Sequence, residues 1–400
     1  MTTLSVVIPA YNEEKGIADI IHRVQAVKED LSKVGIDDLE LLVVDDGSRD
    51  RTAEIISSVP DVHLIRHVKN RGYGAALKNG FCQARGELIG FLDADGTYPP
   101  EYFPNLCKQA LEGDDLVIGS RMAGAESKMP AVRRLGNFFF ANLLTLVSNK
   151  KVTDSASGMR VFRRAILEQL YPLPDGLNLT PVMSTRAIHE GIKVTEVAIP
   201  YSERQGRSKL SALRDGRIFL QSILWTALEY NPVRILGLIG GLGLALAAFI
   251  LAGLVLARLQ GITSLLPWQV AALFAGLVLS VAGVSIFSLG TTFNYLVSLF
   301  YNRPIRQGLF GRPIFDPPLD RHFGWMGVLV LLVGLGIGLV SAVLGLKGWD
   351  MNRLWLYMLG SAMMILMGIQ LVISWVVMRV LEDLSQRDHL IHRDMQISIN

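Results

Sequence analysis

The sequence predicts an α/β domain with a mostly parallel sheet, followed by interfacial helices and an α-helical domain of four transmembrane spans. Three observations predict this fold class. Of the 400 residues, 50% are hydrophobic and only 19% are charged. In the first part of the chain, apolar strands alternate with helical stretches, as in a parallel sheet covered on both faces. In the second part, long uncharged runs follow one another. This composition excludes a disordered chain, a secreted disulfide scaffold and a purely soluble enzyme.

Charge density drops more than twofold near residue 234. Residues 1–234 hold 29 Lys and Arg and 29 Asp and Glu, whereas residues 235–400 hold 10 and 7, which accounts for the whole net charge of +3. The first part is itself asymmetric, with a net charge of −8 over residues 1–120 and +8 over residues 121–217. A basic surface can bind nucleic acid, but four spans follow this one. We therefore expect membrane lipids and an anionic lipid as partners, and no nucleic acid.

Five apolar runs are expected to form the sheet, with a helix near 13–33 and further helices between the later strands. The runs cover residues 4–10, 39–46, 62–66, 88–93 and 115–119. In parallel α/β sheets, ligands bind at the carboxyl ends of the strands. Polar residues collect at these ends: Tyr11-Asn12-Glu13, Asp45-Asp46-Gly47-Ser48, Asp93-Ala94-Asp95 and Ser120-Arg121. A binding site is therefore predicted at this edge of the sheet.

Asp93 and Asp95 follow the fourth strand directly, in a tight turn continued by Gly96. Two carboxylates at this spacing can each point one oxygen towards a hard cation. Mg²⁺ and Mn²⁺ take oxygen ligands and usually share them with substrate phosphates. The sequence therefore predicts a Mg²⁺ or Mn²⁺ site on Asp93 and Asp95. The pair Asp45-Asp46 can form an Asx turn before a helix cap, and this structural role is compatible with binding.

Two further features exclude other kinds of site. Residues 70–74 open a helix, and their glycines allow the backbone to approach a phosphate or a ribose. The segment matches neither the dinucleotide-binding glycine motif nor the Walker A motif, so nicotinamide chemistry and P-loop ATP hydrolysis are not supported. Cys82 and Cys107 lack metal-ligand spacing, and we expect both to be buried thiols in a reduced compartment.

Four uncharged runs are each long enough to span ~30 Å of hydrocarbon as a helix. They are expected to place spans at 235–257, 267–300, 325–346 and 354–378. The loop after the second span and the tail after the fourth carry most of the arginines. This bias predicts a multi-pass cell-membrane protein with the first domain and both termini in the cytoplasm, and no signal peptide precedes that domain. The spans contain no Asp, Glu, Lys or His, which disfavours a transporter.

Two apolar-rich segments with basic ends, 132–149 and 210–230, are expected to lie on the cytoplasmic leaflet as interfacial helices. For the first, an ordinary core-facing helix is the alternative. Gly237/Gly241 and Gly334/Gly338 have a spacing that lets helices pack closely, within the chain or in a homo-oligomer. The predicted organisation is a catalytic domain, juxtamembrane helices, a four-helix membrane domain and a tail, over residues 1–209, 210–234, 235–378 and 379–400.

The strand-end motifs carry a resemblance. The segments 7–14 (VIPAYNEE), 44–48 (VDDGS) and 93–95 (DAD) resemble the inverting family 2 glycosyltransferases with the GT-A, Rossmann-like fold. The segments 154–160 (DSASGMR) and 201–210 (YSERQGRSKL) are similar to the branch that charges a polyprenyl phosphate with a sugar, as dolichol-phosphate mannose synthases and bacterial polyprenyl-phosphate glycosyltransferases do. The resemblance covers about residues 4–215. Mannose synthases usually continue the metal motif as D-A-D-L-Q. Gly96-Thr97 stands there in this chain, so a hydroxyl or water must replace the glutamine ligand.

The resemblance implies transfer of a sugar from a UDP- or GDP-linked donor to a polyprenyl or dolichyl phosphate. It implies that the nucleotide is bound by Pro9, Ala10, Tyr11, Glu13, Asp45, Asp46, Gly72, Asp93 and Ala94, and the metal and diphosphate by Asp93 and Asp95. It places the acceptor phosphate near Arg121, Arg133, Ser157, Arg160, Arg204, Arg207, Ser208 and Lys209. The residues expected to act in catalysis are Asp93, Asp95, Arg121, Arg204 and Lys209.

Elementary chemistry agrees with this assignment. A phosphomonoester has its second pKa at about 6, so it is mostly dianionic at neutral pH and hardly needs a general base. The site must neutralise two anions and hold them in line, which a metal and Arg or Lys side chains can do.

Two alternatives stay open. One is a processive membrane polysaccharide synthase, which would carry Q-x-x-R-W where this chain has Gln221-Ser222-Ile223-Leu224-Trp225. The other is a non-catalytic membrane scaffold or lipid carrier, which would not need the acidic and basic clusters. Product analysis separates these readings, because only the synthase of lipid-linked sugar makes an organic-extractable product.

Overall fold

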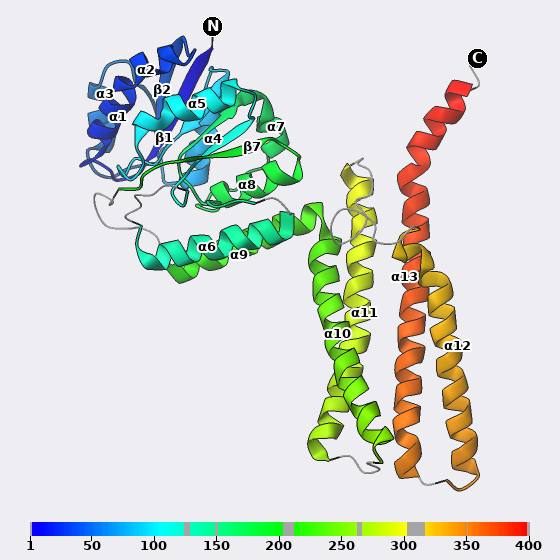
Figure 1. Cartoon of the computed structure of the whole chain (residues 1–400). Coiled ribbons are helices and arrows are strands. Elements are labelled where there is room, and N and C mark those ends of the chain that lie inside the picture. The colour runs from blue at the N-terminus through cyan, green and yellow to red at the C-terminus, as the bar shows by residue number, and fades with distance from the viewer. Residues whose placement is uncertain are drawn as a thin grey trace. The chain divides into compact units, whose positions relative to one another are not determined.

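The computed structural model describes residues 2–123, 129–148, 151–202, 212–261, 266–301, 317–349 and 351–397. The chain divides into two compact units, Met1–Ala227 and Leu228–Asn400. The first holds a β-sheet with helices on it, and the second holds four long helices (Figure 1).

The first unit is built on a seven-stranded sheet in the order β3-β2-β1-β4-β6-β5-β7. The strands are β1 (Thr3–Ala10), β2 (Asp38–Asp45), β3 (His63–Arg66), β4 (Leu88–Phe91), β5 (Leu116–Ser120), β6 (Arg160–Arg163) and β7 (Val194–Ala198). All the ladders are parallel except those that β6 makes with β4 and β5. The five predicted strands are confirmed to within two residues at each end. β6 and β7 were not predicted, because one is four residues long with arginine at both ends and the other lacks a continuous apolar run.

Helices cover both faces of this sheet, which is why β1 consists mostly of buried apolar residues. One face carries α1 (Ile17–Ala26), α2 (Lys28–Lys33), α3 (Thr52–Ser58) and α5 (Phe103–Leu111), and the 3₁₀ turn η1 (Pro100–Tyr102) precedes α5. The other carries α4 (Tyr73–Gln83), α7 (Leu167–Leu170) and α8 (Leu179–His189), with η2 (Arg164–Ile166) before α7. The helix predicted near 13–33 is two helices, which meet at Val27.

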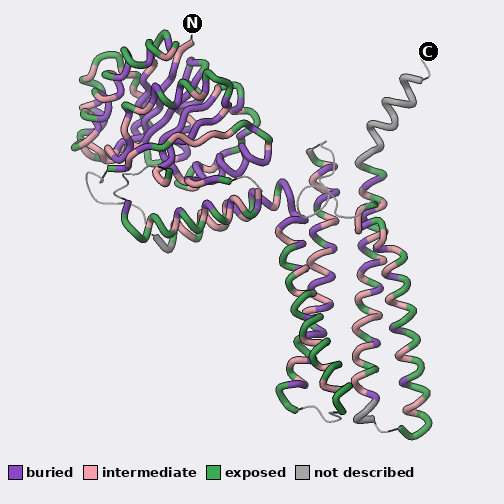
Figure 2. Tube along the Cα trace, viewed as in Figure 1, coloured by how far each residue is buried: buried purple, intermediate pink, exposed green. Residues whose placement is uncertain are grey.

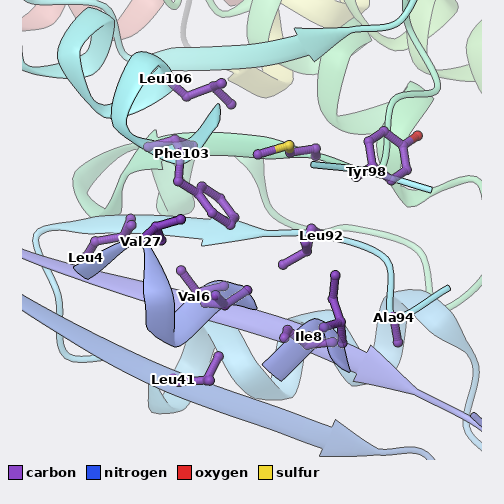
Figure 3. Packing of buried hydrophobic residues seen from close by; sticks show 14 of the residues in the cluster. Leu4, Val6, Ile8, Val27, Leu41, Leu92, Ala94, Tyr98, Phe103 and Leu106 are labelled. Carbon is purple, nitrogen blue, oxygen red and sulfur yellow. The ribbon is translucent and has the colours of Figure 1, made fainter. Parts of the chain in front are cut away.

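The core follows from strand alternation, in which successive side chains point to opposite faces. Leu4, Val6 and Ile8 of β1 belong to the cluster under α1 and α5, whereas Val7 belongs to the cluster under α4 and α8. Figure 3 shows the first of these clusters, with Phe103 beside the β1 side chains. The central strands β1, β4 and β5 are buried over nearly their whole length, in keeping with the buried interior of this unit in Figure 2, whereas the edge strands β3 and β7 are only partly buried. The sheet is therefore a rigid support for the loops at its edge.

The reversed direction of β6 brings a distant segment to the carboxyl edge of the sheet. Phe91 at the end of β4 and Ile118 in β5 both pair with Arg160, the first residue of β6. The segment 154–159 that leads into β6 therefore lies at the edge where β4 and β5 end. This is the edge at which the sequence predicts a site.

Two long helices complete the first unit. α6 (Ala131–Ser148) and α9 (Ala212–Tyr230) lie side by side (Figure 1), and the rings of Phe140 and Phe219 meet between them with centroids 5.8 Å apart. Both helices form where the two interfacial helices are predicted. Large apolar side chains remain exposed on them: Val132, Leu135, Phe138, Phe139 and Leu146 on α6, and Ile218 and Trp225 on α9.

The second unit consists of α10 (Pro232–Leu259), α11 (Pro267–Tyr301), α12 (Leu319–Leu346) and α13 (Met351–Ile397). Each contains a stretch long and apolar enough to cross a membrane: Pro232–Ala257, Pro267–Phe300, Leu319–Leu346 and Leu354–Leu384. The four predicted spans are thus present as helices. The tail expected at 379–400 continues α13 as helix through Ile397.

Small residues set the close contacts in this unit, as expected for helices that pack in lipid. A Cβ on Gly334 or Gly338 would lie within 3.0 Å of atoms of α13, so this predicted pair does lie in a helix contact. A Cβ on Gly241 would meet nothing within 4 Å. The close approach of α10 to α11 is instead made by Gly240, whose Cβ would lie 2.7 Å from the carbonyl oxygen of Gly283.

Candidate functional site

A pocket of about 550 Å³ opens at the carboxyl edge of the sheet, within the first unit. Most of the described residues that the sequence singles out line it: Pro9, Ala10, Tyr11, Glu13, Asp46, Gly72, Asp93, Ala94, Asp95, Arg121 and Arg133. Asp45, Ser157 and Arg160 do not line it. Arg204, Arg207, Ser208 and Lys209 lie outside the described residues.

Asp46 holds the loop that precedes α4. Its Oδ1 accepts hydrogen bonds from the backbone N–H of Arg71 at 2.8 Å and from Nδ1 of His67 at 2.7 Å, and its Oδ2 accepts one from the N–H of Gly72 at 2.9 Å. The loop also packs tightly against the turn that follows β2, because a Cβ on Gly47 would lie 2.7 Å from the backbone of Asn70. Gly47 has φ of +72°, which only glycine adopts readily.

Asp45 has a different place. Its side chain is fully buried, and its Oδ1 accepts the N–H of Ser48, three residues further on, at 3.0 Å. The carboxylate therefore shapes the turn after β2, while its neighbour Asp46 faces the pocket. The sequence alone does not distinguish the two aspartates. Adjacent residues at a strand end point in different directions, and which of them faces the pocket depends on the exact residue at which the strand ends.

Asp93 is positioned by two neighbours from other elements. The hydroxyl of Tyr73, the first residue of α4, donates to Asp93 Oδ1 at 2.8 Å. Burial, and then the charge of Asp93, raise the pKa of Tyr73 well above its ordinary value, so the hydroxyl stays protonated as a donor. A Cβ on Gly158 would lie 2.4 Å from Asp93 Oδ2, so the backbone before β6 approaches the carboxylate as closely as glycine permits.

Asp95 is held by the residue that replaces the usual glutamine. The N–H and the hydroxyl of Thr97 donate to Asp95 Oδ1 at 3.2 and 2.5 Å. Thr97 itself lines the pocket and is almost fully buried. Within the described residues there is no group of three or more His, Cys, Asp or Glu side chains that could hold a metal ion. Two carboxylates, with substrate phosphates and water in the other positions, are an arrangement that Mg²⁺ accepts, and Asp93 and Asp95 fit it.

Arg121, at the end of β5, is fixed on three sides. Its Nε and Nη2 each donate to one oxygen of Asp154 at 2.7 Å. Its guanidinium carbon lies 5.6 and 5.4 Å from the ring centroids of Tyr98 and Tyr201, within range of cation–π attraction. Burial lowers the pKa of Arg121, but the charge and hydrogen bonds of Asp154, with Tyr98 and Tyr201, together raise it well above its ordinary value. The site therefore holds a permanent, preoriented cation.

Ser157 and Arg160 stand behind the pocket wall rather than in it. Both are fully buried. The Ser157 hydroxyl donates to the carbonyl of Gly119 at 2.5 Å, and Arg160 donates to the carbonyls of Ser157 and Ser155 at 3.1 and 2.9 Å. Burial lowers the pKa of Arg160 to about 10, which still leaves it protonated at neutral pH. These two residues shape segment 154–159, which in turn carries Asp154 and Gly158.

The pocket has a polar end and an apolar end. The carboxylates of Asp46, Asp93 and Asp95 lie at the strand ends. Met129, which precedes α6, and Val132, Phe140 and Phe219 of α6 and α9 give the other part of the lining its apolar character, although Asn137 and Asp215 of these helices also line it. Arg133 stands on α6, with its Nη1 donating to the hydroxyl of Tyr201 at 3.4 Å. The shape suits an amphipathic ligand with an anionic head.

Several lining residues were not predicted as site residues: Asn70, Tyr73, Thr97, Tyr98, Asn137, Leu177, Thr180, Tyr201, Asp215 and Phe219. Asn70, Tyr73, Thr97 and Tyr201 belong to segments that the sequence analysis quotes, so the motifs were a usable signal for them. Thr180 comes from α8, where no sequence motif points to the site.

The prediction of two buried thiols is wrong for one of them. Cys107 is buried on α5, and burial raises the pKa of its thiol to about 12. Cys82 is exposed on α4, because it lies on the side of this helix that faces away from the sheet.

Comparison with known proteins gives matches to both units. A family model described as glycosyl transferase family 2 matches residues 5–171, and one described as a domain of unknown function (DUF8752) matches residues 232–392. An undecaprenyl-phosphate 4-deoxy-4-formamido-L-arabinose transferase of Photorhabdus laumondii is 33% identical over 259 residues, which are 63% of this chain and 76% of that protein. The protein of the same name from Pseudomonas aeruginosa is 33% identical over 255 residues, which are 62% of this chain and 71% of that protein.

Among solved structures, glucosyl-3-phosphoglycerate synthase from Mycobacterium tuberculosis, in complex with Mn²⁺, UDP-glucose and phosphoglyceric acid, matches with a TM-score of 0.46 and 21% identity. The match covers 56% of this chain and 80% of that one.

The family assignment rests on the sequence relatives and on the motifs at the sheet edge. The chain matches the Photorhabdus transferase over 76% of that protein's length, and the family 2 model covers the segment that carries β1 to β6. The chain therefore belongs to the family 2 glycosyltransferases with the GT-A fold, in the branch of the polyprenyl-phosphate glycosyltransferases.

Proposed function

We propose that this protein transfers a sugar, with inversion, from a UDP- or GDP-linked donor to a polyprenyl or dolichyl phosphate at the cytoplasmic face of the cell membrane. The observation that supports this most is one pocket with two ends. Asp46, Asp93 and Asp95 line its polar end, and apolar side chains of α6 and α9 line the other. The names of the relatives, which act on undecaprenyl phosphate, support the same acceptor class.

The reaction needs one bond formed and one broken. A phosphate oxygen of the acceptor attacks the anomeric carbon, and the bond from that carbon to the donor diphosphate breaks, with its electron pair leaving on the nucleoside diphosphate. Asp93 and Asp95 would hold a Mg²⁺ or Mn²⁺ ion, which supplies charge neutralisation for the leaving diphosphate. The nucleoside would lie along Pro9, Ala10, Tyr11, Glu13, Asp46 and Gly72, which line the polar end.

The acceptor phosphate would meet Arg121 and Arg133. Arg121 pairs with Asp154 through Nε and Nη2, so Nη1 takes no part in that bidentate pair. A guanidinium held in this way loses little conformational entropy when it binds an anion. From the resemblance, Arg204, Arg207, Ser208 and Lys209 are proposed as further phosphate contacts.

The membrane arrangement is part of the proposal. The exposed apolar side chains of α6 and α9 would enter the cytoplasmic leaflet, with Trp225 among them. A lipid-linked acceptor would then reach the apolar end of the pocket without leaving the membrane surface. The arginines predicted on the same side as the first unit support a cytoplasmic site.

The test is a transfer assay on membranes that contain the full chain. Labelled UDP-glucose, GDP-mannose, UDP-N-acetylglucosamine and nucleotide-linked 4-deoxy-4-formamido-L-arabinose are offered in turn with a polyprenyl phosphate, with Mg²⁺ or with EDTA. We expect an organic-extractable, mild-acid-labile product that forms only with the metal. A water-soluble polymer would favour the processive synthase, and no transfer from any donor would refute the proposal.

Asp95→Ala tests the metal site in the same assay. We expect transfer to fall at least tenfold while the protein stays folded, because one of the two charged ligands is gone. Asp30→Ala on the exposed helix α2 is the matched control. Retention of more than about a tenth of the activity by Asp95→Ala would argue against a metal on this carboxylate.

A further inference from the structure

A chain of side-chain hydrogen bonds runs from the surface of α4 to Asp46. Gln83 Nε2 donates to Asn79 Oδ1 at 3.1 Å, and Asn79 Nδ2 lies 3.0 Å from Nε2 of His67. On its other side, His67 Nδ1 lies 2.7 Å from Asp46 Oδ1. His67 is 5% exposed and does not itself line the pocket, so the mechanism described above leaves it without a role.

The direction of these bonds fixes the tautomer of His67. Because the carbonyl oxygen of the Asn79 amide accepts from Gln83, its Nδ2 is the end that faces His67, and Nδ2 can only donate. His67 Nε2 must then accept, so the proton of the neutral imidazole is on Nδ1 and is donated to Asp46. This series of hydrogen bonds therefore directs the Nδ1–H of His67 towards the carboxylate of Asp46.

Asp46 has room for a ligand only in one place. A carboxylate has about four acceptor positions, and an ionised one never donates. Three positions are filled by His67 and by the N–H groups of Arg71 and Gly72. Two of these three donors meet Oδ1 and one meets Oδ2, so the remaining acceptor position is on Oδ2. The group that Asp46 meets in the pocket must therefore be a donor, such as a ribose hydroxyl or a base N–H.

We propose that His67 is a positioning residue for the donor nucleotide. It fixes the rotation of the Asp46 carboxylate. In this orientation Oδ2 is presented to the nucleoside, and the loop before α4 keeps its two hydrogen bonds to Asp46. The inference rests on the proposed function, since it assumes a nucleotide-linked donor. His67 acts on donor binding, whereas the acceptor phosphate is proposed to lie at Arg121 and Arg133.

Two substitutions of His67 distinguish a hydrogen-bonding role from a purely steric one. In His67→Asn, the amide nitrogen takes the place of Nδ1 on Cγ and can still donate to Asp46. In His67→Gln, the amide nitrogen takes a place closer to that of Nε2, so the donor to Asp46 is lost. His22→Gln, on the exposed side of α1, is the matched control.

The experiment uses the purified full chain and measures kcat, the KM for donor and for acceptor, and binding of UDP and GDP by calorimetry. For His67→Gln we expect a rise of about tenfold in the donor KM and in the Kd of the nucleoside diphosphate that the wild type binds, the size expected from one hydrogen bond to a charged group. The acceptor KM and kcat should change less than about twofold, and His67→Asn should stay within about threefold of the wild type.

Equal behaviour of the two His67 variants, or an unchanged donor KM in His67→Gln, would overturn the inference while leaving the proposed function intact. Should His67→Gln fail to fold, Asn79→Ala tests the same chain, because it removes the contact that fixes the tautomer. It should raise the donor KM about two- to threefold, and an unchanged value would overturn the inference. A wild type that neither transfers a sugar nor binds UDP or GDP would instead overturn the proposed function, and the role of His67 with it.

Discussion

Gly158→Ala is predicted to inactivate the protein without unfolding it. A Cβ at this position would lie 2.4 Å from Oδ2, 2.6 Å from Cγ and 2.7 Å from Oδ1 of Asp93. Ordinary contacts of a Cβ begin at 3.4 Å, so the carboxylate must move by about 1 Å. The carboxylate cannot move freely, because the hydroxyl of Tyr73, at the start of α4, donates to Oδ1. A 1 Å misplacement of a catalytic group costs about a hundredfold in rate, and this is the loss we expect.

The backbone does not oppose this substitution, since Gly158 is not among the glycines with positive φ. The rate of lipid-linked sugar formation is measured at saturating donor and acceptor, over a range of Mg²⁺ concentrations. Gly253→Ala is the control, because a Cβ there meets nothing within 4 Å. A Gly158→Ala rate within about threefold of wild type, with an unchanged unfolding temperature, would refute the claim that the placement of Asp93 limits the reaction.

Two further predictions concern buried groups. Asp154→Ala leaves the largely buried guanidinium of Arg121 without its bidentate partner and should lower the free energy of unfolding by about 3 kcal/mol, measured by pulse proteolysis in urea. A loss below about 1 kcal/mol would show that the pair is effectively solvated. At pH 8, N-ethylmaleimide should modify Cys82 in the folded protein and leave Cys107 untouched, because burial raises the pKa of the Cys107 thiol to about 12 and the thiolate is the reactive form. Mass spectrometry after denaturation distinguishes the two, and equal labelling of the native protein would contradict the buried position of Cys107.

The sequence predicted the parallel part of the sheet and the residues at its carboxyl edge well, for a physical reason. Strands covered on both faces must be apolar throughout, so the polar residues that interrupt them mark the edge. This logic brought Asp46, Asp93 and Arg121 into one pocket. It fails for β6, whose four residues begin and end with arginine. The first of these, Arg160, is buried because it donates to carbonyl oxygens of the segment that precedes the strand.

The two predicted site residues that lie behind the pocket wall have a related explanation. Ser157 and Arg160 belong to a motif that resembles a binding segment, yet their polar atoms bond to backbone carbonyls. Motif position does not say whether a side chain points into a pocket or behind it. In the second unit, Gly240 rather than Gly241 meets α11, because a change of one residue turns a helical side chain by about 100°.

The segment before β6 contacts both charged groups of the site. It supplies Asp154 to Arg121 on one side and Gly158 to Asp93 on the other, four residues apart along a single stretch of backbone. Because both contacts are made by one stretch of backbone, we expect the separation of the cation and the carboxylate to vary less than either position does. For two anionic substrates that must meet in line, under our proposal, the alignment of nucleophile and leaving group is preserved even while the loops around them fluctuate.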